Sequence, residues 1–181
     1  VDNLGAQDAG VEVDERGRIV VNDKMETSVP GVYAIGDIVA TAQLAHVASK
    51  EGIVAVEKAM GADKHVTYAA VPRCVYTEPE VAGVGLTEKD CEKKGVEYKL
   101  GTFDFRALGK GFVKGIVDNN DVIVGASIVG PHATDLLAEL SLAVHLGLTA
   151  EQVGDVIHPH PSLSEALMEA LHDVHGKSVH K

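Results

Sequence analysis

The sequence predicts an α+β fold for most of the chain, in which an antiparallel sheet carries helices on one face. Between residues 71 and 129, short apolar segments alternate with turn residues, which is typical of successive antiparallel strands. From residue 133 onward the apolar positions recur at helical spacing. Strands followed by helices favour a sheet covered on one side. A polar connection at 61–67 precedes this part, so we expect two domains, 1–66 and 67–181.

The first 66 residues contain predicted extended elements and one helix. Segments 11–13 and 18–21 are expected to pair as a hairpin. Pro30 and Gly31 suit the central positions of a type II turn, because Gly tolerates positive φ at the second one. The apolar run 32–35 then predicts a short buried strand. A helix from 42 to 60, ended by Gly61, is expected to bury the apolar residues Leu44, Val47, Ile53, Val54 and Val56.

In the second part the strands precede the helices. Segments 71–76 and 81–85 predict two strands around a turn, and Thr87 is a suitable cap for a short helix that ends near Gly95. Segments 96–105, 111–117 and 122–129 predict three further strands, and the Asp and Asn residues of 118–121 predict the last hairpin turn. Helices are expected at 133–146, after Thr149 and at 163–175.

Composition excludes several classes of function. The 181 residues carry a formal net charge of −11, which opposes non-specific binding to nucleic acid or to anionic lipid. No apolar run approaches the roughly 20 residues that span a bilayer, and no leader pattern precedes the chain, so we expect a cytoplasmic protein. Cys74 and Cys91 are expected to be reduced thiols, with Cys74 in a buried strand. Because the chain begins with Val1, we expect it to be a fragment.

The segment richest in chemical groups is 157–165, which reads IHPHPSLSE. Its prolines hold the backbone extended, so His158 and His160 are displayed on a stiff segment just before a helix. Imidazole suits proton transfer near neutral pH, and Glu165 is a carboxylate able to orient it. Two other interpretations stay open. Ser162 and Glu165 fit a capping box, and the two histidines are a weak candidate for a metal pair.

A second candidate site lies at 33–46. A turn at Gly36 and Asp37 can aim a carboxylate at a sugar hydroxyl, and the helix that starts near Gln43 offers free N–H groups and a positive dipole end. The alternative is that Asp37 only caps a turn.

Together these segments resemble the pyridine-nucleotide disulfide oxidoreductase family over nearly the whole chain. Residues 27–37, TSVPGVYAIGD, look like its second FAD motif, and 44–46, LAH, look like the helix start beneath the flavin. Residues 72–82, PRCVYTEPEVA, look like the opening of its interface domain, and 160–165, HPSLSE, resemble its active-site motif. Residues 1–66 would then be the tail of an α/β FAD-binding domain, and 67–181 the interface or dimerisation domain.

The resemblance also implies roles for single residues. Gly36 and Asp37 would hold the ribityl chain of FAD, and Gln43, Leu44, Ala45 and His46 would approach the pyrimidine edge of the flavin. His160 would be the acid–base, oriented by Glu165, and would reach across a homodimer to the disulfide of the partner.

Within the family, Leu163 and the 44–46 segment favour the enzymes that oxidise protein-bound dihydrolipoamide with NAD⁺. Their partners would be lipoyl domains of 2-oxo acid dehydrogenase complexes or the glycine cleavage H protein, in the cytoplasm or, in a eukaryote, the mitochondrial matrix. Glutathione-type reductases usually carry Ser where this chain has Leu163. A glutathione-type or mercuric reductase, or a dimerisation module without catalysis, is the alternative.

The sequence departs from the family pattern at several places. Ser162 stands where Thr is usual, and Pro159 separates the two histidines. The segment before Gly111 looks several residues shorter than the family norm. The Gly-x-Gly-x-x-Gly fingerprints and the paired redox cysteines are not in the sequence. We therefore expect this chain to be inactive alone and to supply the interface and the acid–base pair.

Overall fold

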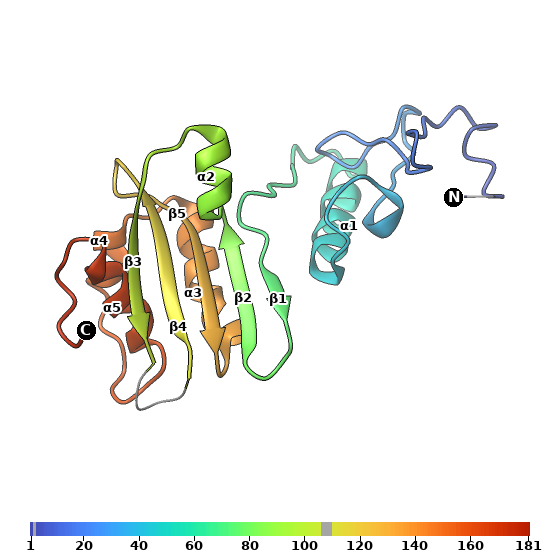
Figure 1. Ribbon diagram of the computed structural model, residues 1–181. Coiled ribbons are helices and arrows are strands. Elements are labelled where there is room, and N and C mark those ends of the chain that lie inside the picture. Colours follow the sequence, from blue (N-terminus) through green and yellow to red (C-terminus); the bar gives the residue numbers. More distant parts are fainter. Residues whose placement is uncertain (2, 106–109) are drawn as a thin grey trace. The chain divides into compact units, whose positions relative to one another are not determined.

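The computed structural model describes residues 1, 3–105 and 110–181, which form two compact units, Val1–Tyr68 and Ala69–Lys181 (Figure 1). The expected shortening before Gly111 adjoins residues 106–109, which lie outside the described residues. Within the described ranges, no helix is both long and apolar enough to cross a membrane.

The second unit is a five-stranded antiparallel sheet with the order β1-β2-β5-β4-β3. The strands are β1 (Arg73–Val75), β2 (Glu80–Gly85), β3 (Tyr98–Asp104), β4 (Phe112–Asp118) and β5 (Ile123–Gly130). Helices α3 (Ala133–Leu146), α4 (Ala150–Gly154) and α5 (Glu165–Asp173) lie together on one side of it (Figure 1). The predicted fold class is therefore confirmed.

The core of this unit lies between the sheet and those helices. Helix α3 packs on β2 and β5, and α5 packs on β3 and β4. The fully buried apolar side chains include Val84, Ile128, Leu137, Leu140, Leu167 and Leu171. Their burial supplies the main stabilisation, at about 1.5–3 kcal/mol for each large side chain.

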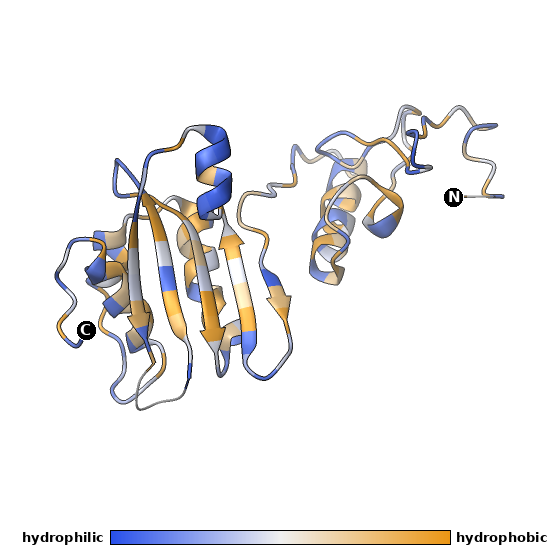
Figure 2. Ribbon diagram, in the orientation of Figure 1, coloured by the Kyte–Doolittle hydropathy of each residue, from blue (hydrophilic) through white to orange (hydrophobic). Residues whose placement is uncertain are grey.

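The short helix α2 (Glu88–Lys94) begins and ends as its sequence predicts. Thr87 Oγ1 accepts a hydrogen bond from the N–H of Asp90, whose carboxylate accepts from the N–H of Thr87, and Gly95 ends the helix in the left-handed conformation. Figure 2 shows α2 as mostly hydrophilic, and its lysines are exposed. One prediction here is wrong in detail. Cys91 of α2 is the buried thiol, whereas Cys74 on the edge strand β1 is only half-buried.

The first unit has little regular structure besides a 3₁₀ turn, η1 (Gly36–Ile38), and helix α1 (Ala45–Ala59). The type II turn forms as predicted, with Gly31 at φ +79° and the N–H of Val32 donating to the carbonyl of Val29 at 3.1 Å. The predicted hairpin is reduced to one antiparallel bridge between Val13 and Ile19.

Two predictions for this unit are wrong. Residues 32–35 are not a buried strand, because a strand needs paired neighbours and this run has only an isolated bridge between Tyr33 and Glu26. Helix α1 begins at Ala45, and its apolar residues Ile53 and Val56 are exposed. The buried stripe of α1 instead consists of Val47, Glu51, Val54 and Ala55, which follow the i, i+4, i+7, i+8 spacing of one helix face.

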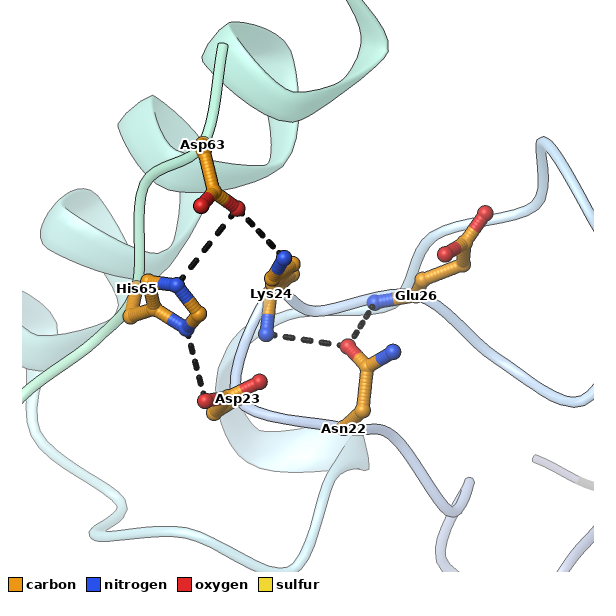
Figure 3. A network of polar contacts seen from close by, with 6 residues as sticks. All are labelled: Asn22, Asp23, Lys24, Glu26, Asp63 and His65. Atoms are coloured by element: carbon orange, nitrogen blue, oxygen red, sulfur yellow. Dashed lines mark hydrogen bonds and ion pairs between the residues drawn. The ribbon is translucent and has the colours of Figure 1, made fainter. Parts of the chain in front are cut away.

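A polar network holds the segment after α1 against an earlier loop (Figure 3). His65 Nδ1 lies 2.7 Å from Asp23 Oδ2, and the N–H of Val66 donates to the carbonyl of Asp23 at 2.9 Å. Lys24 forms an ion pair with Asp63 and lowers the pKa of that carboxyl. These contacts attach the segment after α1 to the rest of the first unit, a few residues before that unit ends at Tyr68.

Candidate active site

His160 and Glu165 form a hydrogen-bonded pair on the surface of the second unit. His160 Nδ1 lies 2.8 Å from Glu165 Oε1. A carboxylate oxygen only accepts hydrogen bonds, so Nδ1 donates to it, and in the neutral ring Nε2 is then the nitrogen that can accept a proton. The His160 side chain is 82% exposed, whereas Glu165 is mostly buried. The imidazole is thus oriented from one side and open on the other.

Glu165 serves as a cap and as the partner of His160 at the same time. Its Oε2 accepts a hydrogen bond from the N–H of Ser162 at 2.8 Å, which is one half of the predicted capping box. The other half does not form, because the Ser162 hydroxyl donates to the carbonyl of Pro159 and contacts Ser164 Oγ. The two interpretations of this carboxylate are therefore compatible.

The electrostatics of Glu165 follow from the same contacts. The N–H of Ser162 lowers the pKa of the carboxyl most, and the hydrogen bond from His160 lowers it further.

His158, two residues earlier, points elsewhere. Its Nδ1 lies 2.8 Å from the carbonyl oxygen of Val156, and its Nε2 lies 3.0 Å from Glu139 Oε1 on α3. The two histidines do not converge on a shared site. Nowhere in the described ranges do three or more His, Cys, Asp or Glu side chains form a group suited to a metal ion.

The helix behind the pair is held in place at several points. Helix α5 approaches β3 closely over Gly101, and Asp173 near its end accepts from the N–H of Thr102 at 2.8 Å. The buried Glu169 accepts hydrogen bonds from Ser178, Val179 and His180 of the C-terminal tail. These contacts fix α5 against the sheet and the C-terminal tail, and with it the first turn that carries Glu165.

The second candidate site lies in the first unit. Gly36 adopts φ +71°, which suits glycine, and a Cβ there would meet the Ala48 side chain at 3.3 Å. Its N–H donates to Glu51 Oε2 at 2.7 Å, which joins the turn to helix α1. Gln43 Nε2 donates to the carbonyl of Asp37 at 3.4 Å. The structure thus brings the two predicted segments of this site together.

The side chains of this site are open to solvent. Helix α1 begins after Leu44 without a side-chain cap, so its positive end is not covered by a carboxylate or hydroxyl of its own. Asp37, Gln43, Ala45 and His46 are exposed, and Leu44 is half-buried. This geometry can receive an electron-rich ligand edge and a sugar hydroxyl together.

Three positions were missed in the sequence. Glu51 is fully buried between the N–H of Gly36 and the hydroxyl of Tyr68, which donates at 2.9 Å. The sequence does indicate its burial, because Glu51 falls among the apolar residues of one face of α1. Glu139 and Glu169 were missed because their contacts lie 19 and 11 residues away, and local spacing carries no information about them.

Comparisons with known proteins bear on both units. Residues 71–171 match the family model for the dimerisation domain of pyridine nucleotide-disulphide oxidoreductases, and residues 1–52 match a second model described as pyridine nucleotide-disulphide oxidoreductase.

Among curated relatives, a dihydrolipoyl dehydrogenase of Thermus scotoductus is 48% identical over 99% of this chain. The human mitochondrial dihydrolipoyl dehydrogenase is 42% identical over 98%. The chain spans only 41% and 37% of the length of these two relatives.

Solved structures of two other proteins are similar to this chain over nearly its whole length. LpdA from Mycobacterium tuberculosis matches 94% of this chain with a TM-score of 0.88 at 26% identity, and 39% of that protein is covered. The HOCl-induced flavoprotein disulfide reductase RclA of Escherichia coli, as its Cu(II) complex, matches 93% with a TM-score of 0.83 at 26% identity, and 41% of it is covered. Because a family model covers more than half of its residues, this chain belongs to the pyridine nucleotide-disulphide oxidoreductase family.

Proposed function

We propose that this chain supplies the C-terminal part of a dihydrolipoyl dehydrogenase, which oxidises protein-bound dihydrolipoamide with NAD⁺. Residues 1–66 would be the tail of its FAD-binding domain, and 67–181 its dimerisation domain. The observation that carries the proposal is the exposed His160 imidazole, held by Glu165 at 2.8 Å on the unit that matches the dimerisation model.

The chemistry needs a base of this kind. A thiol has a pKa of about 8.5, so little thiolate is present at neutral pH. The thiolate is the species that attacks a disulfide. His160 Nε2 would take the proton from one thiol of dihydrolipoamide, and Glu165 would stabilise the resulting imidazolium. The pair would return the proton to solvent before the next turnover.

A homodimer would complete this site. The side chain of His160 is 82% exposed, and the redox cysteines of the family are not in this sequence. The apolar side chains of Leu142 and Leu146 on α3, and of Ile157 three residues before His160, are exposed, and Ile157 reaches 95%. Exposed large apolar residues near one another are typical of a protein interface. In the proposed dimer, the partner subunit would cover these residues and bring its own disulfide within reach of His160.

The first unit fits a role toward FAD. Asp37 is exposed beside the glycine turn and would bond the ribityl hydroxyls, while the backbone of 43–46 at the start of α1 would stabilise negative charge on the pyrimidine edge. FAD supplies the redox chemistry when bound, and NAD⁺ is the proposed electron acceptor. The proposed partners are lipoyl domains of 2-oxo acid dehydrogenase complexes or the glycine cleavage H protein. The proposed location is the cytoplasm or the mitochondrial matrix.

The test uses the complete coding sequence that contains this chain. We expect His160→Gln to lower dihydrolipoamide turnover by about 10²–10⁴-fold, the usual worth of a general base. NADH-driven dye reduction, which needs no proton from a thiol, should persist. His132→Asn is the control and should leave both rates unchanged, because it changes an exposed histidine before α3 to a residue that tolerates the positive φ there. Equal loss of both activities in His160→Gln would contradict the proposal.

The likeness to RclA, a disulfide reductase, makes a different substrate the second candidate. A substrate screen with dihydrolipoamide, glutathione disulfide and mercuric ion separates the two. For a non-catalytic module, the visible spectrum of the purified chain is the discriminating measurement. Flavin absorption would support an enzyme part, and a colourless dimer would support the module.

A further inference from the structure

The segment that displays His160 has a single buried anchor. From Asp155 to Pro161 every residue is exposed except His158, whose side chain is only 4% exposed. We infer that His158 is a positioning residue, whose ring ties this segment to α3 through Glu139 and so sets the position of the His160 imidazole. This inference rests on the proposed function and names a further residue for the same reaction.

Both ring nitrogens of His158 are engaged. The carbonyl of Val156 and the Glu139 carboxylate both only accept, so each contact is donated by a ring N–H, from Nδ1 to Val156 at 2.8 Å and from Nε2 to Glu139 Oε1 at 3.0 Å. The first contact fixes the ring against its own backbone, and the second fixes it to a helix that is packed on the sheet. Two contacts on opposite sides of one planar ring leave little freedom of rotation about the side-chain torsions.

The position of His158 is transmitted to His160 because the chain between them is stiff. Pro159 separates the two histidines, and its ring restricts φ to about −65°. On the other side the Ser162 hydroxyl donates to the carbonyl of Pro159 at 2.6 Å. His160 therefore lies between two attachments, the buried His158 ring and the start of the α5 segment. Without the His158 attachment, the His160 imidazole is held only from the α5 side and can change position. A displacement of about 1 Å can lower the reaction rate about 10²-fold.

The competing interpretation is that His158 is only a buried packing residue. The two interpretations predict different kinetics. A packing residue would affect stability and every activity of the enzyme in parallel. A positioning residue would lower kcat for dihydrolipoamide while KM and the flavin-dependent dye reaction stay the same.

The experiment uses the complete flavoenzyme. His158→Gln retains a group near the Nε2 position and His158→Asn one near the Nδ1 position, so each preserves one contact. We expect each to lower kcat for dihydrolipoamide about 10-fold and His158→Ala about 100-fold, with KM within about twofold. Glu139→Ala, which removes the α3 contact from a partly exposed position, should also lower kcat about 10-fold. The dye rate should not change in any variant.

Controls and opposite outcomes separate the two hypotheses. Asp135→Ala, on the same helix and 85% exposed, is matched to Glu139→Ala and should have no effect. If His160→Gln lowers turnover but the His158 and Glu139 variants keep kcat, the positioning role is overturned and the proposed function stands. A parallel fall in dye reduction would also overturn it. If His160→Gln itself retains turnover, the proposed function fails. Should the His158 variants not fold, the Glu139→Ala result decides.

Discussion

The close contact between β3 and α5 allows a quantitative prediction about Gly101. This glycine lies in β3 beneath α5, the helix whose first residue is Glu165. A Cβ at Gly101 would lie 2.0 Å from the carbonyl oxygen of Ala170 and 2.7 Å from the backbone nitrogen of Val174. Gly101→Ala therefore forces the helix and the strand apart.

The magnitude follows from the size of the overlap. Non-bonded carbon and oxygen atoms approach to about 3.3 Å, so α5 must move by about 1 Å or more. Both obstructing atoms are backbone and cannot rotate away, and the buried Leu167 and Leu171 lose contacts when α5 moves. Overpacking costs about 1–3 kcal/mol, and we expect the upper end of that range.

The assay must report on this unit alone, because the chain has two compact units and a single transition is not guaranteed. Hydrogen exchange of the β3 and α5 amides measures the opening free energy of the second unit directly. Gly83→Ala is the matched control, since Gly83 also lies in a strand and its Cβ would meet its nearest neighbour, the Ala126 carbonyl oxygen, at an ordinary 3.4 Å. That variant should be neutral or more stable by up to about 1 kcal/mol. If these amides exchange equally slowly in both variants, the close contact between α5 and β3 at Gly101 is contradicted.

Two further predictions concern buried carboxylates. Glu51→Ala removes the acceptor of the Gly36 N–H and leaves the Tyr68 hydroxyl with the weak contact to Met25 Sδ, so we expect the first unit to lose about 3 kcal/mol, measured by hydrogen exchange of the α1 amides. Glu51→Gln should lose clearly less, and equal losses would contradict the hydrogen-bonding role. Burial works to raise the pKa of Glu169, but hydrogen bonds from Ser178 and then from His180 lower it overall. Because the folded-state pKa is lowered, docking of the tail is fully stabilised above the ordinary glutamate pKa of about 4.3 and weakens as pH falls below it. Limited proteolysis of the tail should therefore accelerate in acid. Glu169→Gln should reduce that pH dependence, leaving the part that comes from the pair of Lys181 and Asp173.

Much of the fold was predictable because local rules decide it. The hairpin turn at 118–121, the Thr87 cap and the Gly95 stop depend on neighbouring residues, and so do the bounds of α3. The proximity of His160 and Glu165 also follows from local rules, since the two residues are only five positions apart in the sequence. The predicted roles of these two residues, and of 36–46 toward a cofactor, remain predictions.

Other features needed the tertiary structure. Ile53 and Val56 look like core residues in the sequence but are exposed, while the charged Glu51 is buried on the same helix. A periodic pattern shows that a helix has an apolar side, but which side is covered depends on what packs against it.

The sequence by itself determined the class of fold, the order of most elements and the short-range pairing of His160 with Glu165, because each depends on contacts within a few residues. Only the tertiary structure decided the strand order, the close approach of α5 to Gly101 and the attachment of His158 to Glu139. The physical reason is that these contacts join segments far apart in the chain, where packing and hydrogen-bond geometry decide and local propensity carries no information.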